Sequence, residues 1–538
     1  MLAPRAVADM RDDGRTDGGA ADGADSIPGL SRSDPLAAVS PLDGRYAGRT
    51  APLSPYASEA GLMRARTRVE VEYLIALADL DATPIGLDEA SETVLRAVYE
   101  GFSAEDARLI KRLETEGAAG YDATNHDVKA VEYFLRVRLA ELAEGEADGD
   151  PDADGSPLDA DGSPLDDEES PLDADGSPLD DEESPLNDAE SLYPWIHFGL
   201  TSEDVNNLAQ RLLLKPAVSD VIVPAVREVR DALVELAQEH RDAPMLARTH
   251  GQPATPTTFG KEMAVYAARL GRALGRVVVA NEDLSGKLAG ASGTYAAHRA
   301  AYPDVDWRGF SESFVRGLDL EHTALATQVN PCDDLAALFD ALRGVNNVLL
   351  DLDLDAWLYV SDRYLGQEAV EGETGSSTMP HKVNPIDFEN SEGNLSVANS
   401  DLTFLADYVT NSRLQRDLSD STVKRNVGAA LAHCLIGYSK AADGLGKVVP
   451  NEAVMREELE ATPEVIGEAV QTILRREGDT EAYERVKALS RGRSVTLDDF
   501  RELFDDLDID DEVRAELKAL TPAGYTGVAD DLVDELDE

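Results

Sequence analysis

Residues 333–362 read DDLAALFDALRGVNNVLLDLDLDAWLYVSD, with one glycine and no proline. Glycine and proline are the residues that interrupt helices, so this stretch predicts one helix far longer than the average of about 11–12 residues. Residues 57–80, 217–240, 257–282 and 386–410 also carry apolar residues near helical spacing with few breakers. Several such helices in one chain predict a mainly α fold built on an elongated bundle, which subunits could share.

The length and composition limit the class of protein. At 538 residues the chain is too long for a single core and should fold as two or three domains. No apolar run reaches the roughly 18 residues of a transmembrane helix, and residues 1–33 lack an apolar stretch of the signal-peptide kind. The two cysteines, Cys332 and Cys434, make no disulfide framework. We therefore expect a cytoplasmic protein.

The chain is strongly acidic, with 105 acidic and 49 basic residues and a net charge of −56. Such a field repels nucleic acid and anionic membranes, so neither is expected as a partner. Two interpretations are open, a basic partner or the hydrated surface of a halophilic protein. The acids are spread along the chain and most basic residues are arginine, which favours the halophilic surface.

Two segments are of low complexity. Residues 1–33 are acidic and glycine-rich, and we expect a disordered extension there. In the acidic segment 144–190 a seven-residue unit beginning Ser-Pro-Leu-Asp repeats from Ser156 onward. Each unit carries a proline and one large apolar residue, so it has no coiled-coil seam and should be a solvated loop inserted into a folded domain. Calcium binding is an alternative, but the spacing lacks the length and terminal glutamate of an EF-hand loop.

The polar loop at residues 375–385, GSSTMPHKVNP, holds the first set of candidate catalytic residues. Ser376 or Ser377 could act as a base or nucleophile, beside Lys382 and Asn384 as stabilisers of negative charge. This combination suits a reaction in which negative charge develops on a carboxylate or enolate.

Residues 247–254, ARTHGQPA, and 197–207, HFGLTSEDVNN, form the next two motifs. His250 lies in a glycine- and proline-rich turn and is a candidate general acid, although a turn histidine can also simply bond a backbone carbonyl. Thr201 or Ser202 could cap the helix that follows, and the same helix N-terminus could bind a carboxylate or phosphate.

Three further polar segments lie at residues 124–129, 413–425 and 40–46. The first suits a helix cap, and the last is a turn that presents an arginine and a tyrosine. In 413–425, Arg416 and Arg425 with a serine between them could hold a phosphate, or could pair with local aspartates. Together the motifs suggest an anionic, phosphate-bearing substrate and acid–base chemistry. The eight histidines show no metal-ligand spacing, so no metal is expected.

With these motifs in view, the chain resembles the fumarase/aspartase superfamily. The 375–385 loop is similar to its signature, and His381 after Met-Pro resembles the adenylosuccinate lyase branch, where fumarases usually have Gly and argininosuccinate lyases usually Gln. The other motifs resemble further blocks of that branch, in the same order. The resemblance covers roughly residues 36–143 and 191–538.

The resemblance implies a β-elimination that releases fumarate, from adenylosuccinate to give AMP and from the succinyl-carboxamide ribotide SAICAR to give AICAR, in purine biosynthesis without a cofactor. It implies that Ser376 is the general base, that His250 is the general acid, and that Lys382 and Asn384 stabilise the aci-carboxylate. The positions that match the substrate-binding residues of the branch are Arg45, Tyr46, Asn125, His126, Asp127, Thr201, Ser202, Gln328, Arg416, Ser421 and Arg425. Gln328 lies in TQVNPCDD, where the branch often has His in place of Cys332.

The resemblance also implies three mostly helical domains and a homotetramer whose long helices form a shared core, with each active site drawn from three subunits. The expected divisions are residues 34–199 with the 144–190 insert, 200–447, and 448–538. The insert should loop outward, because motifs on both sides of it are expected at the site. The alternatives are another fumarate-releasing lyase, such as argininosuccinate lyase, or a non-catalytic structural protein on the same fold.

Overall fold

The computed structural model describes residues 35–143, 189–368, 383–490 and 495–536. The chain divides into two units, residues 1–48 and 49–538. The described part of the first unit has a short 3-10 helix, Pro35–Ala37, followed by turns as far as the start of α1, Ala47–Thr50. The predictions for residues 1–33 and for nearly all of 144–190 fall outside the described residues.

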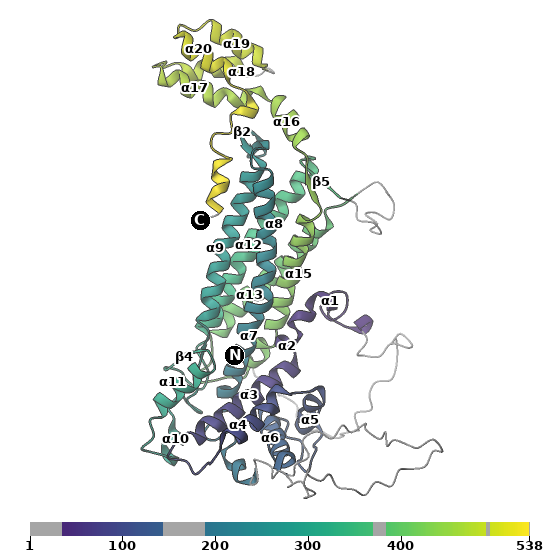
Figure 1. Cartoon of the computed structure of the whole chain (residues 1–538), viewed down its shortest axis with the longest axis vertical. Coiled ribbons are helices and arrows are strands. Elements are labelled where there is room, and N and C mark those ends of the chain that lie inside the picture. The colour runs from purple at the N-terminus through teal and green to yellow at the C-terminus, as the bar shows by residue number, and fades with distance from the viewer. Residues whose placement is uncertain (1–34, 144–188, 369–382, 491–494, 537–538) are drawn as a thin grey trace, which may run out of the picture. The chain divides into compact units, whose positions relative to one another are not determined.

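The second unit is built on a bundle of long helices (Figure 1). The bundle helices are α7 Ser202–Pro216, α8 Val223–Glu239, α9 Phe259–Glu282, α12 Asp333–Ser361, α13 Ile386–Val409 and α15 Val427–Leu445. Helix α12 packs against α9 and α13, α13 against α15, and α8 against α9 and α15. Buried Asn346 of α12 ties three of them, because it donates to Asn399 at 3.0 Å and accepts from the hydroxyl of Tyr438 at 2.6 Å. The predicted mainly α fold and the predicted long helices are confirmed.

Helices α7 and α8 form one continuous rod. A π-helical turn, Ala217–Ile222, joins them, and helical backbone runs without a break from Ser202 to Glu239. Pro216 has no N–H to donate, which is a usual cause of such a local irregularity. At 1.5 Å per residue the rod is roughly 55 Å long. Its two ends therefore lie far apart in one subunit.

A second set of helices surrounds the N-terminal end of α7. They are α2 Ser54–Ala57, α3 Glu59–Ala78, α4 Glu89–Glu100, α5 Ala104–Thr115, α6 Asp127–Ala143, α10 Ala296–Ala301, α11 Trp307–Gly317 and α14 Ser419–Lys424, with the 3-10 turns Ala51–Leu53 and Ala189–Trp195. Helix α3 packs against α7 and α4, and α6 packs against α5.

A third set of helices follows α15. It comprises α16 Glu452–Glu460, α17 Gly467–Arg476, α18 Ala482–Ser490, α19 Leu497–Asp505 and α20 Asp511–Ala519, with 3-10 turns at Pro463–Ile466, Pro522–Gly524 and Asp531–Leu536. These helices bury a core of their own that includes Leu474, Phe500, Phe504 and Leu517, and Leu246 of β1 joins it. The proposed division of the chain into three domains stays a prediction.

Three two-stranded sheets are present in the described residues, and the sequence patterns did not predict them. The hairpin β1 Pro244–Thr249 and β2 Gln252–Thr258 is antiparallel, β3 Ser285–Gly286 pairs in parallel with β4 Glu321–His322, and β5 Leu365–Gln367 pairs antiparallel with β6 Val448–Pro450. Each sheet fastens a connection between helices.

Candidate functional site

Three of the predicted motifs meet at the N-terminus of α7. Thr201 is the residue before the helix and Ser202 is its first residue. The Ser202 hydroxyl lies 3.5 Å from Nε2 of His126, which precedes α6. The Thr201 hydroxyl accepts a hydrogen bond from Nε2 of Gln328 at 3.3 Å. Segments that are far apart in the sequence therefore present hydroxyl, imidazole and amide groups to one place.

A backbone N–H three residues further along the chain orients the His126 imidazole. Its Nδ1 accepts a hydrogen bond from the backbone N–H of Lys129 at 3.2 Å. In the neutral imidazole the other nitrogen then carries the proton, so Nε2 is the donor that points toward Ser202. The His126 side chain is 52% exposed. An oriented N–H at an open surface can bind an anionic or carbonyl oxygen of a ligand.

Asp127 opens α6 and lies between two arginines. Its Oδ2 is 2.7 Å from Nη2 of buried Arg66 and 3.6 Å from Nη2 of exposed Arg425. Burial favours the protonated form, but Arg66 outweighs it and holds the pKa of Asp127 below its usual range. Asn125, two residues earlier, has a positive φ of 49°, a conformation that asparagine tolerates better than most residues. This turn is therefore fixed on one side by a buried ion pair and is open on the other.

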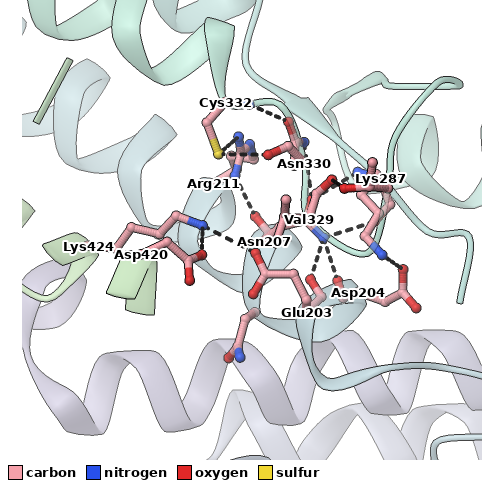
Figure 2. A network of polar contacts seen from close by, with 12 residues as sticks. Glu203, Asp204, Asn207, Arg211, Lys287, Val329, Asn330, Cys332, Asp420 and Lys424 are labelled. Atoms are coloured by element: carbon pink, nitrogen blue, oxygen red, sulfur yellow. Dashed lines mark hydrogen bonds and ion pairs between the residues drawn. The ribbon is translucent and has the colours of Figure 1, made fainter. Parts of the chain in front are cut away.

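The fully buried carboxylate of Asp204 holds the N-terminus of α7 in place (Figure 2). Asp204 accepts the backbone N–H groups of Thr201 at 2.9 Å, Ala289 at 2.9 Å and Gly290 at 3.0 Å. Lys287, also fully buried, places its Nζ 2.7 Å from the same carboxylate. Thr201 is the N-cap residue of α7, as predicted, and Asp204 also binds the loop after β3 to the helix. Thr201 is thus held by its backbone, and its hydroxyl faces Gln328.

Two further buried cations hold neighbouring segments to α7. Arg211 is fully buried and grips Asp334 in the first turn of α12, with Nε and Nη2 at 2.9 and 2.8 Å from the two carboxylate oxygens. Its Nη2 also lies 3.6 Å from the Cys332 sulfur. Lys424 of α14 contacts Glu203 in the first turn of α7. Sequence reasoning did not predict that Arg211 and Lys424 are buried. For Arg211, a charged residue within the apolar run LAQRLLL at 208–214 was a usable signal.

The basic segment 413–425 lies beside this site. Thr327 donates its hydroxyl proton to the Gln415 carbonyl at 2.9 Å, which joins the segment to the residues around Gln328. Arg416 and Ser421 are half-buried in it. Arg413 pairs with Asp417 at 3.3 Å. For Arg413, therefore, the structure shows the local salt bridge that was the alternative to phosphate binding.

His250 lies at the other end of the α7–α8 rod. It is exposed at the tip of the β1–β2 hairpin, where it and Gly251 have positive φ values of 56° and 70°. The hairpin is braced near its tip, because Arg248 pairs with Glu458 of α16 and lies 3.4 Å from Asp362. Within one chain His250 and Thr201 are therefore separated by about the length of the rod, and a single subunit does not bring them together.

The remaining predicted residues divide into two groups. Ser376, Ser377, His381 and Lys382 lie outside the described residues, and Asn384 is half-buried two residues before the start of α13. Arg45 and Tyr46 belong to the first unit, in the turn before α1.

No group of three or more His, Cys, Asp or Glu side chains in the described part of the chain is arranged to hold a metal ion. None of the described helices is both long enough and apolar enough to cross a membrane.

Comparisons with known proteins show which family the chain resembles. Residues 186–398 match the model of a lyase family, and residues 412–526 match a family described as adenylosuccinate lyase C-terminal. Adenylosuccinate lyase of Escherichia coli K12 is 42% identical over 93% of this chain and 99% of its own length. The enzymes of that name from Vibrio cholerae and Dictyostelium discoideum are 41% and 39% identical, over 93% and 92% of this chain and 99% and 97% of theirs.

Solved structures show the same fold at lower identity. A fumarate lyase from Mesorhizobium sp. BNC1 has a TM-score of 0.65 and 20% identity and covers 95% of this chain and 99% of its own. A 3-carboxy-cis,cis-muconate lactonizing enzyme from Pseudomonas putida has a TM-score of 0.63 at 20% identity, over 90% and 95% of the two chains. The expected fumarase/aspartase-type fold is confirmed.

Proposed function

The chain belongs to the adenylosuccinate lyase family, and on that premise we propose that it cleaves adenylosuccinate to AMP and fumarate and SAICAR to AICAR and fumarate. The observation that carries the proposal is the near-complete coverage in both directions by relatives of that name, at 42% identity for the Escherichia coli enzyme. The match of residues 412–526 to a family specific to that enzyme favours this substrate class over that of other fumarate-releasing lyases.

We assign the chemistry to four residues. Ser376 removes the Cβ proton of the succinyl group, and Lys382 and Asn384 stabilise the resulting aci-carboxylate. The electron pair then forms the double bond of fumarate as the carbon–nitrogen bond breaks, and His250 protonates the departing nitrogen. The proton lost from carbon and the proton gained by nitrogen balance, so the reaction needs no redox partner.

Substrate binding is assigned to residues whose chemistry suits a nucleotide and a dicarboxylate. Arg416, Ser421 and Arg425 would hold the phosphate, since guanidinium groups offer forked donors to its oxygens. The other proposed ligands are Arg45, Tyr46, Asn125, His126, Asp127, Thr201, Ser202 and Gln328. The oriented Nε2–H of His126 and the Thr201 and Ser202 hydroxyls support a binding role for this end of α7.

We further propose that the working form is a homotetramer. Large apolar side chains are exposed along the long helices, which supports burial against other subunits. They include Val279 of α9, Leu354, Trp357 and Leu358 of α12, and Phe404 of α13. The separation of His250 from Thr201 within one chain is a second support, because a site containing both needs more than one subunit.

We also propose a cytoplasmic location and a halophilic origin. Cys332 and Cys434 are both free and buried, which suits a reducing compartment. The net charge of −56 suits a surface that must stay hydrated in concentrated salt.

The proposed activity is tested by following absorbance on addition of adenylosuccinate, with argininosuccinate as the alternative substrate, in molar KCl. We expect turnover of adenylosuccinate alone, and losses of about 10²-fold or more in kcat for Ser376→Ala and for His250→Ala. Ser377→Ala is the matched control for the neighbouring hydroxyl. Absence of turnover with adenylosuccinate in a folded preparation would refute the proposal.

A further inference from the structure

The buried side chains of helix α14 are charged, and its apolar residue Val423 is only half-buried. The helix has only six residues, and its two buried residues are Asp420 and Lys424. The large apolar residues just before it are exposed, Leu414 at 88% and Leu418 at 73%. A helix this short is not stable by itself, so its position depends on what holds these two side chains.

The two buried residues of α14 form an ionic clamp with Glu203 of α7 (Figure 2). The Lys424 Nζ lies 2.9 Å from Oδ2 of Asp420 and 3.2 Å from Oε1 of Glu203. The three side chains are 3%, 8% and 2% exposed, respectively. Burial opposes the charge of Lys424, but Cys332, Glu203 and Asp420 outweigh it and raise the pKa. Since little water reaches these groups, the attraction is screened far less than at a surface.

The clamp sets the rotation of α14 about its own axis. Asp420 and Lys424 are four residues apart and share the buried face of the helix. Ser421 and Arg425 each follow one of them and are therefore turned by about 100° to the neighbouring face. On that face Arg425 reaches to 3.6 Å from Asp127, at the turn that precedes α6. Glu203, at the other end of the clamp, directly follows Ser202.

We propose that Lys424 is a positioning residue for nucleotide binding, which fixes the face of α14 that carries Ser421 and Arg425 against the N-terminus of α7. The inference rests on the proposed function, because it assigns those two residues to the substrate phosphate. It adds a residue that does not contact substrate and acts only through the placement of others. Its loss should therefore weaken binding of the nucleotide part and leave the chemical step largely intact.

Lys424→Met is the principal variant. The lysine stem lines a largely apolar cavity of about 220 Å³ together with Leu62, Leu213 and Leu431, so a methionine fits there. We expect KM for adenylosuccinate to rise about tenfold or more with kcat within about threefold, the signature of lost ground-state binding. Product inhibition by AMP should weaken, whereas inhibition by fumarate should not. Lys424→Arg, which keeps the charge, should restore most of the affinity.

Two further variants separate the clamp from general destabilisation. Lys215→Met removes another lysine that bridges two carboxylates, Asp319 at 2.9 Å and Glu282 at 3.4 Å, and should leave KM unchanged. If Lys424→Met does not fold, Glu203→Gln/Lys424→Met keeps the local net charge of the wild type and carries the same expectation.

Hydrogen exchange gives a readout that does not depend on the proposed activity. Amides of residues 413–425 should exchange faster in the Lys424→Met protein than in the wild type, and those of the Lys215→Met protein should not. This comparison stands even if the wild type fails to cleave adenylosuccinate, an outcome that would refute the proposed function alone. Unchanged KM and unchanged exchange in Lys424→Met, or a fall in kcat without a rise in KM, would overturn the inference.

Discussion

Asp353 should make the folded protein less stable as pH rises. It is 1% exposed in the middle of α12, and neither carboxyl oxygen has a hydrogen-bond partner among the described residues. Burial raises the pKa of Asp353 to about 8. The Ser391 hydroxyl lies nearby without good hydrogen-bond geometry to either oxygen and opposes the rise only in part, and Glu392 adds to it. At neutral pH the native protein therefore holds a proton on this carboxyl that the unfolded chain has released.

The magnitude follows from the two pKa values. Between the ordinary value of 3.8 and the raised value of about 8, the native state binds the extra proton, so stability falls as pH rises and levels off above pH 8. The slope is at most about 1.4 kcal/mol per pH unit and subunit, and the accumulated cost at pH 7 is at most about 4 kcal/mol. Asp353→Asn has no proton to release and should lack this cost.

The assay is denaturant unfolding of wild type and Asp353→Asn at several pH values from 5 to 9, at one subunit concentration and one salt concentration. The variant should gain on the wild type steadily up to pH 8 and no further above it. Asp340→Asn, an exposed change on the same helix, is the matched control and should show no such trend. A stability difference between Asp353→Asn and wild type that is the same at pH 5 and pH 8 would refute the reasoning.

Three other outcomes follow from the chain. Deletion of residues 144–190 with a short linker should leave kcat and KM for adenylosuccinate largely intact; loss of turnover in a folded protein would show that the insert takes part in the site. The melting temperature should rise between 0.1 and 3 M KCl, and a flat curve would exclude a halophilic surface. In α9, Gly260→Ala should destabilise the folded protein because the added Cβ would lie 2.4 Å from the Ala237 carbonyl oxygen. The Cβ of Gly275→Ala meets nothing within 4 Å, so that change should be neutral or stabilise the fold by up to about 1 kcal/mol. Thermal unfolding of both variants measures the difference.

The long helices were predictable because their information is local. The apolar residues of 333–362 repeat at helical spacing with no proline, and α12 spans Asp333–Ser361 as that pattern requires. The hairpin at 244–258 was missed for an equally local reason. Pro253 and Pro256 argue against a strand, yet β2 has a single partner, and a strand of that kind tolerates residues that cannot donate.

The buried charges of the site were not predictable in the same way. In a chain with 105 acidic residues, a single Asp or Glu carries no mark of burial. Asp204 can be fully buried because three backbone N–H groups and Lys287 converge on it. One of these N–H groups belongs to Thr201, but the other partners lie more than 80 residues away in the sequence. Only the tertiary arrangement distinguishes it from the solvated acids around it.

The separation of the two halves of the site predicts complementation between subunits. His250 and Arg425 lie near opposite ends of a rod roughly 55 Å long, so a site that uses both must take them from different copies. The His250→Ala and Arg425→Met proteins are assayed at an adenylosuccinate concentration well below the KM of Arg425→Met, where neither protein alone turns over appreciably. Mixing them, with dissociation and reassembly, should then give sites in which both donors are intact. Random mixing of equal amounts makes about a quarter of the sites intact, and recovery should approach that fraction of wild-type activity. The His250→Ala/Arg425→Met double variant, mixed with either single variant, should recover nothing. If mixed oligomers form and activity stays at the level of the separate variants, the two residues do not serve one site and the proposed sharing between subunits is wrong.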